Sequence, residues 1–219
     1  MKPSERGWTI VLVGAWNQAI FNPSWILKYL FGEEGEHQVE IGVALGADER
    51  MFTFSDQGVA FKISPRRISI KPLELSEGVM QQANTCAENL LTRLQHTPVT
   101  AAGVNFLFTS EGDGDEFRET FSLNDGGSIE DAGLSTAETK IVRKFSGITD
   151  HGNPDLILTI SRDEETLATL ADFNYHYTCE TPADLGAAIH QSFLGLKAHA
   201  ESVLQAFGIE LEELNDDQD

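Results

Sequence analysis

Apolar residues recur at every third or fourth position in two long stretches of the chain, the spacing that places them on one face of an α-helix. The first stretch, about 76–95, begins at Ser76, a residue type that caps helix N-termini well. The second, about 182–207, has Pro182 at its first position and ends at Gly208, as helices commonly do. The pattern therefore predicts two long helices, one near the middle of the chain and one near its end.

The rest of the chain is patterned as β-strands, with short apolar runs or regular alternation of apolar and polar residues. Residues 166–179 alternate most regularly, so that Phe173 and Tyr175 fall on one face of the strand. Gly58 separates two short runs and has the backbone freedom that a tight hairpin turn requires. The expected strands cover residues 8–16, 39–45, 51–55, 59–64, 68–70, 99–109, 117–123, 139–145, 156–160 and 166–179.

The order of these elements is several strands, a helix, several more strands and a second helix. Adjacent strands joined by short turns favour antiparallel pairing, so we expect an α+β fold whose antiparallel sheet is built from meanders. A single compact body is expected over residues 1–209, and two similar meander-plus-helix halves, 1–97 and 98–209, are an open alternative within it. Residues 124–137, rich in Gly, Ser and Asp, predict a loop, and residues 210–219 predict an acidic tail.

Charge is distributed unevenly along the chain. The 219 residues contain 35 Asp+Glu and 15 Lys+Arg, a net charge of −20, yet residues 1–73 contain eight of each kind. The excess of acid therefore lies entirely in the remainder, whereas the first third carries a basic group. That group consists of Lys62, Arg66, Arg67 and Lys71. We expect one positive and one strongly negative surface, which favours self-association or an oppositely charged protein partner and argues against direct nucleic-acid binding.

The sequence indicates a cytoplasmic protein. No run of about 18 apolar residues occurs, so we expect no membrane-spanning helix. Cys86 and Cys179 are isolated and do not make a disulfide framework, so both are expected to be reduced. Lys2 and Arg6 precede the apolar run 8–16, as in a secretory signal peptide, but no small-x-small cleavage site follows. A buried first strand is the interpretation we favour.

One strand carries a row of polar side chains suited to chemistry. Asp172, Asn174 and His176 share a face at two-residue spacing, and a metal site or a general base could use them with help from another strand. The alternative, which we favour, is the solvent-facing side of an antiparallel sheet. No nucleophile, phosphate-loop, HExxH or paired CxxC motif occurs, and the carboxylates at 111–116 do not complete a calcium loop. We therefore expect no metal and no cofactor.

A cluster of aromatic residues lies in the charge-neutral first third of the chain: Trp16, Phe21, Trp25 and Tyr29. Large aromatic rings dominate both protein cores and recognition surfaces. Packing into the core is one interpretation of the cluster, and docking of a protein partner is the other. Any of these rings that the fold leaves exposed is our first choice for a partner-binding surface.

These observations favour a non-catalytic protein-interaction module: an adaptor, an immunity-type protein or a regulatory subunit that binds another protein, with homo-oligomer formation as a further expectation. The lack of catalytic motifs, the polarised charge and the aromatic cluster carry this prediction. A metal-dependent or small-molecule enzyme using Asp172, Asn174 and His176 is the first alternative. An acidic mimic of nucleic acid, which would occupy a DNA-binding protein, is the second.

Overall fold

The computed structural model of the protein describes residues 1–33, 35, 37–43, 48–111, 126–133, 135–179, 181–190 and 192–212. It confirms the expected α+β class, because a large antiparallel sheet packs against helices on one of its faces.

Within the described residues the sheet has ten strands, and each runs antiparallel to its neighbours. In chain order they are β1 (Lys2–Pro3), β2 (Thr9–Gly14), β3 (Glu40–Val43), β4 (Arg50–Phe54), β5 (Val59–Ile63), β6 (Arg67–Pro72), β7 (Val99–Ser110), β8 (Glu138–Phe145), β9 (Asp155–Asp163) and β10 (Thr169–Thr178). Across the sheet the order is β3-β4-β5-β6-β2-β7-β10-β9-β8, and the short β1 pairs with β7. The first meander, β3 to β6, and the second, β8 to β10, thus lie on opposite sides of the central pair β2–β7. Duplication of the two halves stays a prediction.

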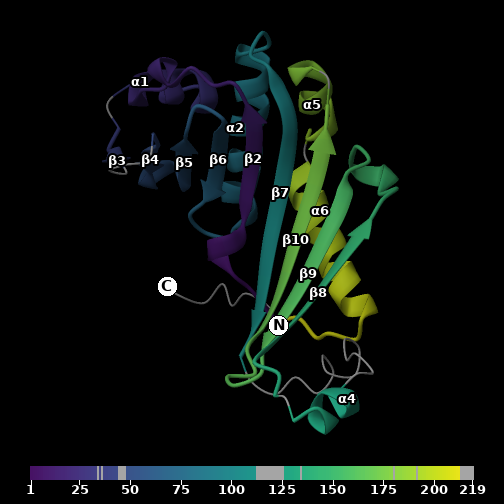
Figure 1. Ribbon diagram of the computed structural model, residues 1–219. Coiled ribbons are helices and arrows are strands. Elements are labelled where there is room, and N and C mark those ends of the chain that lie inside the picture. The colour runs from purple at the N-terminus through teal and green to yellow at the C-terminus, as the bar shows by residue number, and fades with distance from the viewer. Residues whose placement is uncertain are drawn as a thin grey trace.

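The long helices lie against one face of this sheet. Besides short 3₁₀ turns, the described helical elements are α1 (Pro23–Ile26), η3 (Leu27–Phe31, a π-helical turn that continues α1), α2 (Glu77–Arg93), α4 (Gly126–Asp131), α5 (Pro182–Ala188) and α6 (Ser192–Ala206). In Figure 1, α2 lies behind the first meander and α6 behind the second, while the opposite face of the strands points toward the viewer.

The second predicted helix, 182–207, is divided in the structure into α5 and α6. α5 begins as predicted, with the Thr181 hydroxyl accepting a hydrogen bond from the backbone N–H of Asp184. α6 then starts afresh, where the buried Asn84 of α2 accepts a hydrogen bond from the Phe193 N–H at 3.2 Å. The apolar spacing continues through the break because both helices face the same core, so periodicity alone does not reveal it.

Two further sequence predictions concern the connection between β7 and β8. The strand predicted at 117–123 lies outside the described residues. The sequence predicts a loop over 124–137, whereas the structure has α4 within that range. The six residues of α4 are too few for apolar periodicity to register as a helix.

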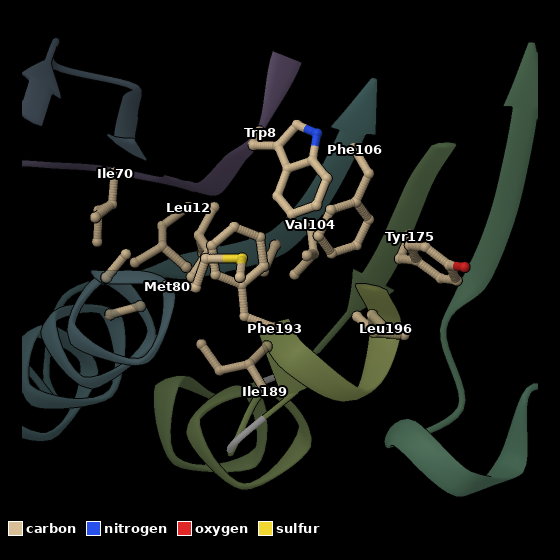
Figure 2. Packing of buried hydrophobic residues seen from close by; sticks show 14 of the residues in the cluster. Trp8, Leu12, Ile70, Met80, Val104, Phe106, Tyr175, Ile189, Phe193 and Leu196 are labelled. Carbon is tan, nitrogen blue, oxygen red and sulfur yellow. The ribbon is translucent and has the colours of Figure 1, made fainter. Parts of the chain in front are cut away.

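The core lies between the sheet and the helices and is continuous from one meander to the other. Figure 2 shows its centre, where Trp8 and Phe106 from the sheet layer meet Phe193 of α6 and Met80 of α2. The Trp8 and Phe106 rings pack edge-on with centroids 5.0 Å apart, and Phe106 stacks on Phe193 at 5.3 Å. Every second residue of β7 and β10 points into this core, so the residues between them lie on the opposite face.

Candidate functional site

The face of the sheet opposite the long helices carries much of the polar chemistry predicted from the sequence. We call it the open face, because no described α-helix covers it, although the short 3₁₀ turn at Glu5–Gly7 packs on Leu107 at its rim. Strand alternation places Arg67, Ser69 and Lys71 of β6 here, since the isoleucines between them are buried. Lys62 of β5 pairs in register with Ser69 and belongs to the same face. The predicted basic group thus shares one face, apart from Arg66 in the turn before β6.

The predicted polar row of β10 lies on the open face as well. Asp172, Asn174 and His176 alternate with buried aromatic residues, and strand pairing sets Asn174 opposite Asn105 of β7. The Asn174 amide Nδ2 donates to Asn105 Oδ1 at 2.8 Å, and Asn105 Nδ2 donates to Thr9 Oγ1 at 3.0 Å. These hydrogen bonds cross from β10 through β7 to β2 and fix the orientation of both amides.

Arg67 of the basic group and the polar row meet in one hollow of the open face, with a volume of about 510 Å³. The hollow is lined by Arg6, Gly7, Thr9, Val11, Val13, Arg67, Ala102, Gly103, Asn105, Leu107, Asp172, Asn174 and His176. Lys62, Arg66 and Lys71 are not part of this lining. Side chains from both halves of the chain therefore face a single space.

A second hollow of about 500 Å³ shares His176 with the first and lies at the end of β10. Its lining includes Asp155 of β9, Asp184 of α5 and Cys179. Burial and the neighbouring Asp184 carboxylate raise the pKa of the Cys179 thiol. Cys179 is therefore not an activated nucleophile, because it is the thiolate that reacts.

The two carboxylates beside the polar row have opposite pKa shifts. Partial desolvation in the concave surface raises the pKa of Asp172, although its side chain reaches solvent, and Lys140 of β8 offsets part of this rise. Asp155 accepts hydrogen bonds from Lys144 and Ser146, each at 2.7 Å, and these lower its pKa. Asp155 is thus held ionised by its own neighbours, whereas Asp172 has no such close donor among the described residues.

The polar row does not gather into a compact metal-binding or acid–base centre. At about 3.4 Å per residue, Asp172 and His176 lie roughly 14 Å apart along the strand, too far for one metal ion or a shared proton. Among the described residues, no three His, Cys, Asp or Glu side chains are grouped to hold a metal ion. The row is better suited to contact a ligand at several points than to bind one ion.

The basic residues of the open face differ in their partners. Lys62 forms an ion pair with Glu49 at 2.8 Å, so its charge is largely offset. Arg67 Nε donates to a neighbouring serine hydroxyl at 3.2 Å. No described carboxylate forms an ion pair with Arg66, Arg67 or Lys71. Their positive charge is therefore not neutralised within the described part of the chain.

The structure divides the predicted aromatic docking cluster. Trp16 and Phe21 are 4% and 2% exposed, because the chain after β2 packs back onto the core and carries both rings inward. As core residues, they offer no surface to a partner. Trp25 of α1 and Tyr29 of η3 are half-buried, with ring centroids 5.3 Å apart. Arg93 of α2 lies over the Tyr29 ring at 5.5 Å, so this pair belongs to the helical layer and not to the open face.

Nine of the residues that line the hollow have no functional role predicted from the sequence, and among them are Arg6, Thr9, Gly103 and Asn105. Gly103 lies in the middle of the central strand β7, and a side chain there would meet its nearest neighbour at 3.9 Å, an ordinary contact distance. The fold therefore does not require glycine at this position. A glycine inside a strand was the available signal, since it often marks the close approach of a ligand or another chain.

A separate polar cluster lies on the covered face, between β10 and α6. The Tyr175 hydroxyl and His199 Nδ1 are 2.7 Å apart, and the Tyr177 hydroxyl donates to the backbone carbonyl of His151 at 2.8 Å. Burial lowers the pKa of His199, and the nearby His151 lowers it further. Burial also raises the pKa of both tyrosines, so they stay neutral. The cluster fastens the turn at 149–151 to α6 and to the sheet.

Comparison of the chain with protein-family models, with curated proteins and with solved structures found no match. No helix in the described part of the chain is long and apolar enough to cross a membrane.

Proposed function

We propose that this protein is a non-catalytic protein-binding module and that its open face receives the partner. The observation that carries the proposal is the meeting of Arg67 with the polar row of β10 in one hollow, on a face that no described α-helix covers. The chain has a net charge of −20, so a face with unneutralised cations differs sharply from the rest of the surface. Such contrast orients partners and excludes wrong ones. We place this activity in the cytoplasm, because two isolated cysteines are typical of a reducing compartment.

A polypeptide suits the open face better than a small molecule does. The first hollow lies on the open face, and the second continues from it at the end of β10, where α5 lines it. The two share His176 and extend from Asp172 to Cys179. At about 3.4 Å per residue this stretch is roughly 24 Å long, which matches several residues of an extended chain. An enzyme that used both groups on one reacting atom would instead need each of them within about 3 Å of that atom. The spacing of Asp172 and His176 does not provide that.

The half-buried Trp25–Tyr29 pair is a second candidate surface for the same function. Aromatic rings beside an arginine are frequent anchors of interfaces, and Arg93 lies over Tyr29. The pair and the open face belong to different layers of the molecule, so variants of one should leave the other intact. This separation allows a direct comparison.

The proposal is tested by affinity capture from native lysate at low and moderate salt, read by mass spectrometry. The bait variants are Arg67→Gln with Lys71→Gln for the open face, and Trp25→Ala with Tyr29→Ala for the helical layer. Lys197→Gln on α6 is the control, because it removes one positive charge on the covered side. Each variant is first checked for folding by circular dichroism.

A stoichiometric protein that is retained by the control and lost by the open-face variant supports the proposal. Loss with the aromatic variant alone would move the binding surface to the helical layer. If the captured species is a second copy of the chain, sedimentation at rising concentration will show a concentration-dependent mass. Capture of a DNA-binding protein that ignores the open-face variant would support an acidic mimic instead, and a bait that captures nothing would refute the proposal.

A further inference from the structure

The first hollow presents hydrogen-bond donors that an acceptor group of a ligand could engage. Gly103 lines the hollow as a buried residue, and the position where its side chain would begin lies 3.9 Å from Asn105 Nδ2 and 4.0 Å from Asn174 Nδ2. Both amide nitrogens therefore converge on the space above Gly103. An amide nitrogen carries two N–H donors, and the hydrogen bonds of the described residues engage one on each. One donor on each amide is left for a ligand.

Positive charge flanks the same space. Arg67 and Arg6 line the hollow, and no described carboxylate forms an ion pair with Arg67. His176 pairs in register with Gly103 and adds an imidazole to the wall. A carboxylate is an acceptor-only group and binds most strongly to arginine and amide donors. The donors around Gly103 match that chemistry.

We infer that the open face binds an extended acidic segment of the partner protein, with one Asp or Glu side chain inserted over Gly103. This inference rests on the proposed function and names the chemistry of the partner. Among the residues that line the hollow, Arg6 and Arg67 carry positive charge and Asp172 is the one carboxylate, so a short acidic segment meets more positive than negative charge there. A nucleic acid carries a far denser charge and is repelled by the net charge of the whole chain.

Asp172 provides a second, opposite test of the same chemistry. It is the one carboxylate among the residues that line this hollow, and no close donor among the described residues neutralises it. An acidic ligand is repelled by Asp172, so Asp172→Asn should tighten binding several-fold. A basic or neutral ligand would lose affinity or show no change with the same variant.

The experiment selects a displayed library of random ten-residue peptides on the purified full-length protein at 50 mM salt. The selected peptides are then measured by fluorescence anisotropy against four variants. Gly103→Val fills the space above the buried Gly103, where an added Cβ makes ordinary contacts. Circular dichroism checks that this variant folds, and binding should be abolished. Arg67→Gln should weaken binding about tenfold, Asp172→Asn should strengthen it, and Lys197→Gln on α6 should leave it unchanged.

Enrichment of Asp- and Glu-containing peptides with this pattern of variants supports the inference, as does a loss of affinity at 300 mM salt. Enrichment of basic or apolar peptides, no enrichment at all, or tighter binding of a 20-nucleotide single strand that competes with the peptides would each overturn it. If affinity capture yields a partner that depends on the open face while the library yields no acidic peptides, the proposed function stands and this inference fails.

Discussion

Asn84 offers the sharpest test of how the helical layer is held together. Its side chain is 1% exposed, accepts a hydrogen bond from the Phe193 N–H and donates one to the Glu88 carboxylate. The Phe193 N–H belongs to the first turn of α6, where backbone donors have no partner within the helix. Asn84 therefore joins α2 to the start of α6, and Asn84→Ala removes that junction.

The expected loss of stability follows from these contacts. Removing a side chain that caps a helix N-terminus costs about 1 kcal/mol. Because the Phe193 N–H is buried, leaving it without an acceptor moves this same loss into the higher range of about 1–3 kcal/mol. We therefore expect Asn84→Ala to lower the free energy of unfolding by about 1–3 kcal/mol. Thr92→Ala, at an exposed position of the same helix, should change it by less than about 0.5 kcal/mol.

Urea unfolding followed by tryptophan fluorescence measures this difference. Trp8 is fully buried with its ring 6.4 Å from that of Phe193, and Trp16 and Trp25 lie in or against the same core, so the summed emission follows the unfolding of that core. With a denaturant slope of about 2–3 kcal/mol per molar urea, the midpoint for Asn84→Ala should fall by about 1 M. A shift no larger than that of Thr92→Ala would show that α6 does not depend on Asn84.

Three further predictions concern other parts of the fold. In thermal unfolding, Gly152→Ala should destabilise the protein by more than about 2 kcal/mol, because Gly152 has φ +73° and an added Cβ would lie 2.6 Å from the α5 backbone. The control Gly147→Ala, at φ +87° in open space, should cost about 1 kcal/mol. The pKa of His199 in the folded protein lies below its ordinary value of 6.5, so the neutral form of His199 favours folding. The contribution of His199 to stability should be full above pH 6.5 and decline as the pH falls from 6.5 toward the folded pKa. His199→Gln should flatten that decline, measured as urea midpoints from pH 7 to 5. A thiol reagent at pH 8 should modify half-buried Cys179 slowly and Cys86 only on unfolding, since burial raises the pKa of the Cys86 thiol and shields it; equal rates in the folded protein would contradict this.

The sequence by itself determined which residues share a face within each element. Alternation along 166–179 put Asp172, Asn174 and His176 on one side of a strand, and the structure keeps them there. The side chains of Ser76 and Thr181 cap the helices that follow them. These features are decided by the covalent geometry of neighbouring residues, so a local pattern is enough to reveal them.

The tertiary structure alone decided which strands are neighbours. β2 lies between β6 and β7, and β7 also pairs with β10, so Arg67 and His176 line the same hollow although they come from different halves of the chain. The same packing buried Trp16 and left Trp25 half-exposed. It also divided the last helix at a contact with Asn84. Such contacts join residues distant in sequence, and the burial of the whole core selects them; no local pattern of apolar and polar residues carries that information.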